Sequence, residues 1–324
     1  MSSTNASGDL SSEMEVDAFR RLFPLRFHKR HLLESTRPHA RKLGKARDTT
    51  LALGAVASTD GSALAKIGCT IMARRRQWVS ILSRPRVEMM TPAQVLRAEV
   101  TMLIIDFHMH PICSSIVRPG KPADAAPVIS KQLSNTILSS GMINFKELSL
   151  VSGKVAWMAY LVMTTFILFL QDIYCLDADG ALSEAAFLEA VAAFSHLQIP
   201  VVSLNDDGRV VVISEEDGGK LKCEPVKKGK RKLKLSSVPF SLTCILYKNY
   251  MLADPTAEEE SIMETLVTVV LDSSFQLVSL YKPDGPVLAY TSAIQLRDCI
   301  ALTRQSVKEL QKVLNEAISE IEWD

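Results

Sequence analysis

MLADPTAEEESIMETLVTVVLD, residues 251–272, is the stretch that decides how the rest of the chain is interpreted. Its first half predicts a turn, because proline fixes the backbone φ and the side chains of Asp254 and Thr256 can bond to nearby backbone groups. Three glutamates follow at 258–260. Residues 265–271 are β-branched and apolar, a composition typical of a half-buried strand. The stretch therefore predicts an acidic turn that leads into a strand.

Two functions are open for this turn. Carboxylates gathered at the mouth of a strand are suited to a metal-dependent phosphoryl-transfer site, because hard cations such as Mg²⁺ prefer oxygen ligands. The same cluster also fits a solvated surface turn with no chemical role. The composition of the stretch alone does not separate these two interpretations.

Composition limits the class of protein. The chain has 324 residues, 47% of them hydrophobic and 23% charged, which is ordinary for a folded protein of one large or two smaller domains. Six cysteines without a CxxC pair argue against a zinc ribbon or a disulfide framework and favour a reducing compartment. Residues 1–17 lack an apolar core, so we interpret them as a short disordered tail and not as a secretory signal.

One apolar run, residues 155–171 (VAWMAYLVMTTFILFLQ), carries no charged side chain. A membrane-spanning helix needs at least about 17 mostly apolar residues, so this run is just long enough. Its two central threonines and the lack of a positive cluster at either end argue against a span. A buried core helix is the favoured interpretation of a run this short, with a membrane anchor as the alternative.

Periodicity and turn signals predict a mixed α+β architecture with two subdomains. A β-hairpin is expected over 49–70, because an Asp-Gly pair at 60–61 separates two strand-like runs. Helices are expected over 126–140, with an apolar face of Val128, Leu133, Ile137 and Leu138, and over 182–197 and 292–323. Further strands are expected over 200–204, 209–214, 238–247 and 265–280.

Two groups of cations stand out as candidate contact residues. Lys227, Lys228, Lys230 and Arg231 belong to a dense basic run that could bind RNA phosphates or act as a nuclear import signal, and equally could be a solvated loop. Arg118 and Lys121 lie in a Pro-Gly turn that would hold cations at a rim or channel. The chain has no P-loop, dinucleotide fingerprint or nucleophile elbow, so the common nucleotide and hydrolase assignments lack support.

Several blocks of the sequence, taken together, resemble the RNase PH family. They are RPHARKLGKARDTT (37–50), STDGSALAKIGCT (58–70), PICSSIVRPGKP (111–122), DIYCLDADG (172–180), LNDDGRV (204–210) and ADPTAEEE (253–260). The resemblance implies an α+β fold of two βαβ-type subdomains with mixed sheets, covering helices and a long C-terminal helix. We place the first domain at 18–204 and the second at 205–324. Active relatives are phosphate-dependent exoribonucleases that shorten RNA from its 3′ end.

Transferring the family's site to this chain implies that its chemistry is lost. Active members hold metal with two aspartates six positions apart, and these fall on Glu260 and Leu266. Leucine cannot ligate Mg²⁺. Active members also follow an Asp-Gly turn with a Gly-Thr-Arg phosphate grip, where this chain has Ala181, Leu182 and Ser183. Serine cannot replace the planar arginine fork. The resemblance therefore implies a protein that is not an enzyme and that needs neither a metal nor another cofactor.

The function implied is a structural one. RNase PH-like subunits form the six-membered core ring of the RNA exosome, as three heterodimers, with oligonucleotide-binding cap subunits and hydrolytic nucleases attached. RNA threads the channel of the ring, and Arg118 and Lys121 match its channel-side loop. We expect nuclear, nucleolar and cytoplasmic locations. The alternatives are an active phosphate-dependent 3′-to-5′ exoribonuclease and a membrane-anchored protein using residues 155–171.

Two segments depart from the family's pattern. Residues 71–105 are longer and richer in arginine than expected, and residues 162–171 (VMTTFILFLQ) interrupt what should pass directly from a helix to a strand. An unusual splice form or gene model is the favoured explanation of both. Either segment would disturb folding, because each lies beside core elements and not in a surface loop.

Overall fold

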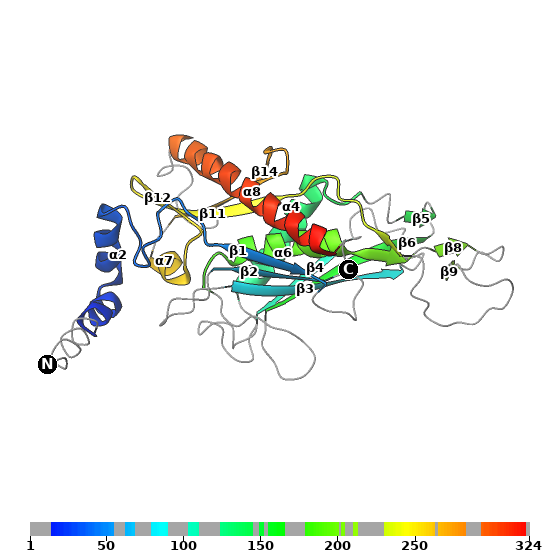
Figure 1. The fold of residues 1–324 in the computed structure, drawn as a ribbon, viewed down its shortest axis with the longest axis horizontal. Helices are drawn as coiled ribbons and strands as arrows, with labels where there is room; N and C mark the ends of the chain where they lie inside the picture. Colours follow the sequence, from blue (N-terminus) through cyan, green and yellow to red (C-terminus); the bar gives the residue numbers. More distant parts are fainter. Residues whose placement is uncertain are drawn as a thin grey trace.

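The structure is a computed structural model, and it describes most of the chain in separate stretches. The described residues are 14–54, 62–68, 79–89, 103–109, 124–144, 149–151, 155–165, 179–200, 202–204, 210–212, 230–262, 265–282 and 293–321. The resulting architecture is α+β, with two main sheets and helices packed between and across them (Figure 1).

The first sheet has six strands in the order β1-β2-β3-β6-β4, with β5 also paired to β6. The strands are β1 (Thr49–Leu53), β2 (Ala63–Ile67), β3 (Val79–Met89), β4 (Leu103–Met109), β5 (Ser149–Val151) and β6 (Val155–Thr165). Strands β1 and β2 pair antiparallel with Thr49 opposite Ile67, which confirms the strand pair of the expected hairpin. In β2 buried and half-buried residues alternate, so one side of this sheet faces the core.

A parallel crossover joins β4 to β6 through α4 (Ala125–Ser140). This unit contains the βαβ arrangement that the resemblance implied. The helix ends at Gly141, whose left-handed backbone (φ 64°) closes the last turn. It buries Leu133 and Ile137 as expected. Val128 and Leu138 are exposed, however, so the face predicted from apolar spacing was wrong at these two positions.

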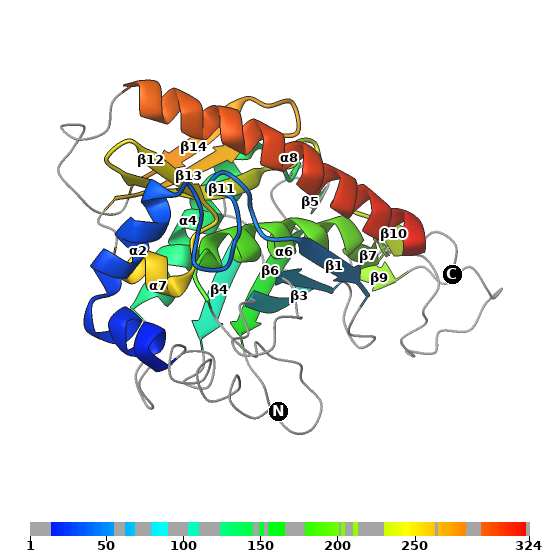
Figure 2. The same cartoon turned by 60° about the vertical axis from the view of Figure 1, so that its left-hand side comes forward.

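Helix α6 (Leu182–His196) lies in the interior of the molecule. It packs against β2 and β3 of the first sheet and against β11 of the second (Figure 2). Because both faces meet a sheet, residues 184–194 are all buried, including Phe187 and Phe194. The alanine-rich sequence suits this position, since small side chains let the helix fit between two layers.

The second sheet has the order β12-β11-β13-β14 and is antiparallel throughout. Its strands are β11 (Phe240–Tyr247), β12 (Tyr250–Ala253), β13 (Leu266–Leu271) and β14 (Leu277–Tyr281). The strand structure expected over 265–280 consists of two strands joined by a turn at 272–276. Short antiparallel pairs complete the described sheet structure: β7 (Gln198–Pro200) with β10 (Lys230–Lys232), and β8 (Val202–Leu204) with β9 (Val210–Val212).

The C-terminal helix α8 (Ala293–Ile321) crosses β1, β11 and β13, which ties both sheets together. Its stripe of apolar residues faces the body of the protein, with Val307, Leu314 and Ala317 buried. One hydrophobic cluster includes residues of both sheets and of α4, α6 and α8. The two domains proposed from the sequence, 18–204 and 205–324, thus share a core, and their boundary stays a prediction.

Two expectations differ from the structure. Val155–Thr165 form strand β6, hydrogen-bonded to β3 and β4, so the helix expected in the apolar run was wrong over these residues. A strand between two others buries apolar side chains without needing helical spacing. Within the described part of the chain, no helix is long and apolar enough to cross a membrane. Residues 14–22 are helical, so the last four residues assigned to the tail belong to a helix.

Candidate functional site

The acidic turn is a capped helical turn. Thr256 and Glu259 flank the start of the short helix α7 (Ala257–Ile262) and bond to each other in both directions. The Thr256 N–H donates to Glu259 Oε2 at 3.0 Å, and the Glu259 N–H donates to Thr256 Oγ1 at 3.3 Å. This reciprocal capping box satisfies two helix-start donors within the T-x-x-E sequence. Glu259 is thereby a structural residue.

Asp254, just before the turn, is fully buried and is held by two arginines from the loop at 37–47. Arg47 donates from its side chain to both carboxylate oxygens, at 2.6 and 2.8 Å, and its backbone N–H adds a bond of 2.7 Å. Arg41 contributes a further bond at 2.8 Å. Asp254 has a left-handed backbone, with φ at 50°, that these contacts hold in place.

Arg37 extends this contact between loop and turn. Its side chain is buried and donates to Glu259 Oε2 at 3.2 Å and to the backbone oxygen of Leu43 at 2.7 Å. It also donates to the backbone oxygens of Ala253 and Asp254. One guanidinium therefore crosslinks its own loop to the turn more than 200 residues away. Buried charges of this kind are stable only when their hydrogen bonds are satisfied.

A second turn, at Asp179-Gly180, packs directly on the acidic turn. A Cβ at Gly180 would lie 2.4 Å from the backbone oxygen of Pro255, so only glycine fits there, and its φ of +70° also favours glycine. Asp179 Oδ1 accepts the N–H of Ala257 at 2.9 Å. In return, Glu260 Oε1 accepts the N–H of Ala181 at 2.8 Å. Each of the two turns therefore accepts one hydrogen bond from the other.

The charges of this cluster shift one another's pKa values. Burial alone would raise the pKa of Asp254, but the neighbouring Arg47 and Arg41 hold it below its usual value. Burial raises the pKa of Glu260 to about 7, because its hydrogen bond from the Ala181 N–H and the positive charge of Arg47 only partly offset desolvation. Burial likewise raises the pKa of Asp179 and lowers the pKa of Arg37 to about 10.

The three glutamates of the acidic turn all have partners within the chain. Glu258 pairs with Arg20, Glu259 with Arg37, and Glu260 with the N–H of Ala181. The three carboxylates are thus engaged by the chain itself, and Glu259 is fully buried, so the turn is not a solvated one. Among the described residues, no group of three or more His, Cys, Asp or Glu side chains is arranged to hold a metal ion.

The structure brings together only part of the site predicted from the sequence. Leu182 and Ser183 begin α6, Glu260 lies in α7, and Leu266 is the first residue of β13. In the other predicted group, Lys230 and Arg231 belong to β10, which pairs with β7 away from this cluster, and the Arg231 side chain is exposed. The predicted RNA contacts Arg118, Lys121, Lys227 and Lys228 lie outside the described residues.

Residues that reasoning from sequence passed over form the centre of the cluster. Arg37, Arg41 and Arg47 were noted for the resemblance of their block, and no partner was assigned to them. The signal was present, because three arginines within eleven residues need counter-charges when a loop is buried. The same holds for Thr256 and Glu259, whose spacing matches a capping box.

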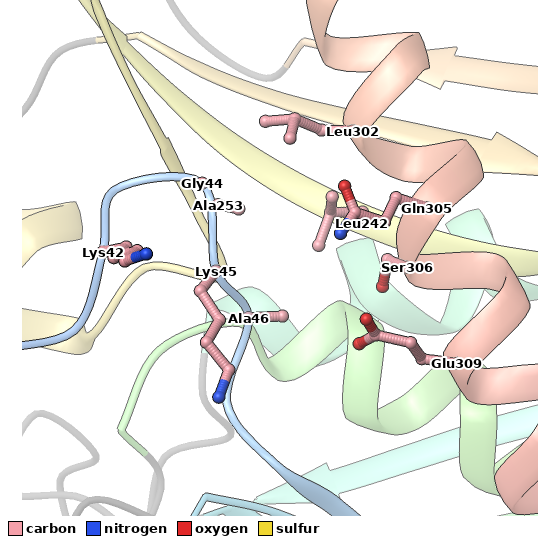
Figure 3. A pocket seen from close by; sticks show the side chains of 10 residues that line it. All are labelled: Lys42, Gly44, Lys45, Ala46, Leu242, Ala253, Leu302, Gln305, Ser306 and Glu309. Atoms are coloured by element: carbon pink, nitrogen blue, oxygen red, sulfur yellow. The ribbon is translucent and has the colours of Figure 1, made fainter.

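A cavity of about 410 Å³ opens on the other side of the 37–47 loop, between this loop and α8. Figure 3 shows Lys45 on the loop and Glu309 on the helix lying across this cavity from each other. Its remaining lining residues are Lys42, Gly44, Ala46, Leu242, Ala253, Leu302, Gln305 and Ser306. The arrangement of ammonium and carboxylate groups on opposite walls suits a polar or dipolar group more than an apolar one.

The fold and the cluster define an α+β protein whose two sheets enclose a central helix and whose two turns are fastened by buried arginines. Comparison with known families gives its assignment. Residues 45–200 match the model for domain 1 of the 3′ exoribonuclease family, and residues 237–306 match the model for domain 2. Together the matches cover well over half of the chain. The chain belongs to the 3′ exoribonuclease, or RNase PH, family, as the resemblance implied.

Two of the curated proteins to which the chain is similar illustrate the exosome names that these relatives carry. The chain is 25% identical over 287 residues to the exosome complex component rrp43 of Schizosaccharomyces pombe, covering 88% of this chain and 93% of that protein. It is 27% identical over 308 residues to the exosome complex component Rrp42 of Thermococcus onnurineus, covering 95% and 98%. Both alignments run through nearly the whole of each protein.

Solved structures show the same fold. A chain of the Archaeoglobus fulgidus exosome with RNA bound to the active site superposes with a TM-score of 0.68 at 18% identity, covering 92% of this chain and 98% of that one. A chain of an archaeal exosome core gives a TM-score of 0.63 at 18% identity, covering 93% and 99%. At this identity the likeness concerns the fold, and it confirms the RNase PH-like architecture expected from the sequence.

Proposed function

We propose that this chain is a non-catalytic subunit of the exosome core ring, where it supports 3′-to-5′ RNA processing and degradation by scaffolding and by threading RNA. Support comes from relatives named as exosome components, which align with this chain through nearly their whole length. A ring subunit keeps the fold of its enzymatic relatives because the ring needs its shape, while the residues of the chemical step are free to change.

The observation that carries the non-catalytic part of this proposal is the bond between Glu260 and the N–H of Ala181, at 2.8 Å. Family resemblance places the phosphate grip just after Asp179-Gly180, at the start of α6. Backbone N–H groups at a helix start are the donors that hold an anionic ligand in such a site. In this chain, the Glu260 carboxylate already accepts a hydrogen bond from one of these donors, the N–H of Ala181. An attacking phosphate would meet an occupied donor and a like charge.

The metal half of the family's site supports the same proposal. Leu266 stands at the position aligned with the second metal-binding aspartate, and its side chain offers no oxygen ligand. The first aligned position, Glu260, is directed to the backbone of the neighbouring turn. Positioning and charge stabilisation supply nearly all of phosphoryl-transfer catalysis, so losing both groups removes its basis.

The partners proposed with this function are other RNase PH-like ring subunits and RNA, with oligonucleotide-binding cap subunits and hydrolytic nucleases attached to the ring. The proposed RNA contacts remain Arg118 and Lys121, with the basic run of Lys227, Lys228, Lys230 and Arg231 as a second group. Such cations contact the RNA backbone whatever its sequence. We propose nuclear, nucleolar and cytoplasmic locations on the same grounds.

A degradation assay tests the absence of catalysis. The purified chain, alone and in complex with its ring partner, is incubated with 5′-labelled single-stranded RNA and Mg²⁺, with and without inorganic phosphate. We expect no phosphate-dependent shortening of the RNA by the chain alone. Any shortening by the complex should continue at the same rate when this chain carries Glu260→Gln.

The opposite result would favour the alternative, an active phosphate-dependent exoribonuclease. This candidate is kept because the family itself is one of 3′ exoribonucleases. Phosphate-dependent shortening by the chain alone, or a complex inactivated by Glu260→Gln, would support it. A melting temperature of the variant no lower than that of the wild type would show that the loss concerns chemistry and not folding.

A further inference from the structure

The N-terminal helical arm, defined here as residues 14–33, packs on the rest of the chain through one face only. Phe27, His28 and Leu32 of helix α2 (Pro24–Leu33) are buried. Leu32 joins the small hydrophobic cluster of the second sheet, and Arg20 pairs with Glu258 of α7. The arm is therefore a fixed part of the structure, and it lies at the edge of the molecule (Figure 2).

The opposite face of the arm carries large apolar side chains in contact with solvent. Leu22 is 71% exposed, Leu25 37% and Leu33 76%. In helix α2, Arg26, Arg30 and Leu33 lie on one outward side and Leu25 lies at its margin, at about 100° per residue. Leu22 ends the preceding helix at 14–22, and Phe23 separates the two helices. Within the described residues, most of the large apolar side chains that are exposed belong to this arm: Met14, Val16, Phe19, Leu22, Phe23, Leu25 and Leu33. Exposed apolar groups gathered in this way mark an interaction surface.

The charge of the arm specifies the surface that would cover it. Residues 18–33 contain five Lys and Arg side chains and no Asp or Glu. Arg20 is engaged with Glu258, but Arg26 and Arg30 are exposed beside the leucines. A complementary surface must bury leucines and present carboxylates around them, because an exposed arginine left without a counter-charge at an interface is costly to desolvate.

We propose that the outward face of the arm docks into an apolar groove with an acidic rim on a neighbouring RNase PH-like subunit. The identity of this partner rests on the proposed ring function. Leu22, Leu25 and Leu33 enter the groove, and Arg26 and Arg30 pair with its rim. This is a form of helix-in-groove recognition, in which a few apolar anchors provide most of the binding energy.

Two other occupants fit the arm less well. Proteins that bind single-stranded RNA stack bases on aromatic side chains. In the arm, Phe19 and Phe23 are 39% and 48% exposed, less than Leu22 and Leu33, which are 71% and 76% exposed. A helix lying on a membrane needs one continuous apolar face. In the helix at 14–22, Met14, Leu22, Phe19 and Val16 spread over more than half of the circumference, with Glu15 among them, at about 100° per residue. A groove that encloses the helix accommodates this distribution.

Reconstitution of the ring tests the proposal. The full chain is co-expressed with the other RNase PH-family subunits of the same organism, and assembly is measured by light scattering after gel filtration. One variant carries Leu22→Asp, Leu25→Asp and Leu33→Asp, and a second carries Arg26→Glu and Arg30→Glu. Ile294→Asp is the control, because Ile294 is 62% exposed and lies outside the arm. Melting temperatures confirm that each variant is folded.

The proposal predicts that the leucine variant binds its neighbour at least about tenfold more weakly, that the arginine variant also loses affinity and much of its dependence on salt, and that the control assembles normally. A leucine variant that assembles like the wild type would overturn the proposal and leave the ring function intact. A wild-type chain that never assembles would overturn both.

The other occupants are tested in parallel with a 30-nucleotide single-stranded RNA and with vesicles of phosphatidylserine and phosphatidylcholine. We expect the leucine variant to bind the RNA as the wild type does, and we expect neither protein to bind the vesicles. If the leucine substitutions abolished binding to one of these probes and left assembly unchanged, the arm would serve RNA or lipid, and the proposal would be wrong.

Discussion

The carboxylate of Glu260 accepts the backbone N–H of Ala181 at 2.8 Å, which joins helix α7 to the start of α6 across 79 positions of sequence. The opposite bond, from the Ala257 N–H to Asp179, completes a closed pair of contacts between two turns. A carboxylate at a helix start stabilises the helix, because it faces the positive end of the helix dipole. Burial opposes that gain by favouring the protonated form of Glu260.

The first prediction concerns pH. Burial raises the pKa of Glu260 from 4.5 to about 7, so the folded protein binds this proton more tightly than the unfolded chain. Between these two values, the stability that the proton contributes is lost as the pH rises. Glu260→Gln keeps an oxygen acceptor for Ala181 but cannot ionise. We expect the variant to melt at a higher temperature than the wild type above pH 7, and at nearly the same temperature near pH 4.5.

The measurement is the difference in melting temperature between the two proteins at pH 4.5, 6, 7 and 8.5. Other titrating groups are common to both proteins and cancel in this difference. A difference that stays constant over this range would contradict a raised pKa at Glu260.

The second prediction concerns Asp254. Substituting Asp254→Asn removes the charge that Arg41 and Arg47 share, and leaves two largely buried guanidinium groups without a counter-ion. We expect the free energy of unfolding to fall by about 3–5 kcal/mol, measured by urea denaturation. Lys45→Ala is the control, because the Lys45–Asp48 pair is 3.8 Å apart and exposed. This variant should remain within about 0.5 kcal/mol of the wild type. Equal losses of unfolding free energy in the two variants would show that the Asp254 contacts contribute no more stability than an exposed ion pair.

The third prediction compares two glycines that share a left-handed backbone. Gly180→Ala places a Cβ 2.4 Å from the backbone oxygen of Pro255, whereas Gly141→Ala meets nothing within 4 Å. The Gly141 variant should lose about 1–2 kcal/mol through backbone strain alone. The Gly180 variant should lose distinctly more, because the two turns must separate. Thermal unfolding of both variants measures this, and similar losses would argue against close packing of the turns.

The fourth prediction tests the proposed channel contacts. Arg118→Glu with Lys121→Glu should reduce crosslinking of RNA to the assembled ring, because reversed charges repel phosphate. Arg297→Glu with Lys312→Glu is the control, since both side chains lie exposed on α8, at 78% and 77%. Unchanged crosslinking in the first variant would remove these residues from the path of the RNA.

Local patterns in the sequence predicted the elements whose signals are local. The pair β1 and β2, the helices α4, α6 and α8, and the strand β13 all follow from periodicity and turn residues. The apolar run at 155–165 was predicted wrongly, because a continuous run of apolar residues fits a buried strand as well as a buried helix. The pairs with β3 and β4 that decide between them are formed with residues more than 50 positions away.

The turn at 254–260 likewise combines features set by the local sequence with features set by the tertiary structure. Its sequence determined an acidic, proline-containing turn before a strand, and the family resemblance predicted that Glu260 and Leu266 would not support catalysis. The partners of its carboxylates were decided by the tertiary structure. Arg37, Arg47 and Ala181 lie far from the turn in sequence and come within hydrogen-bond distance of it through the packing of the fold. Charge alone cannot choose between water, a metal ion and an arginine as the partner of a glutamate. Burial makes that choice, because it removes the water and leaves only the groups that the fold brings within hydrogen-bond distance.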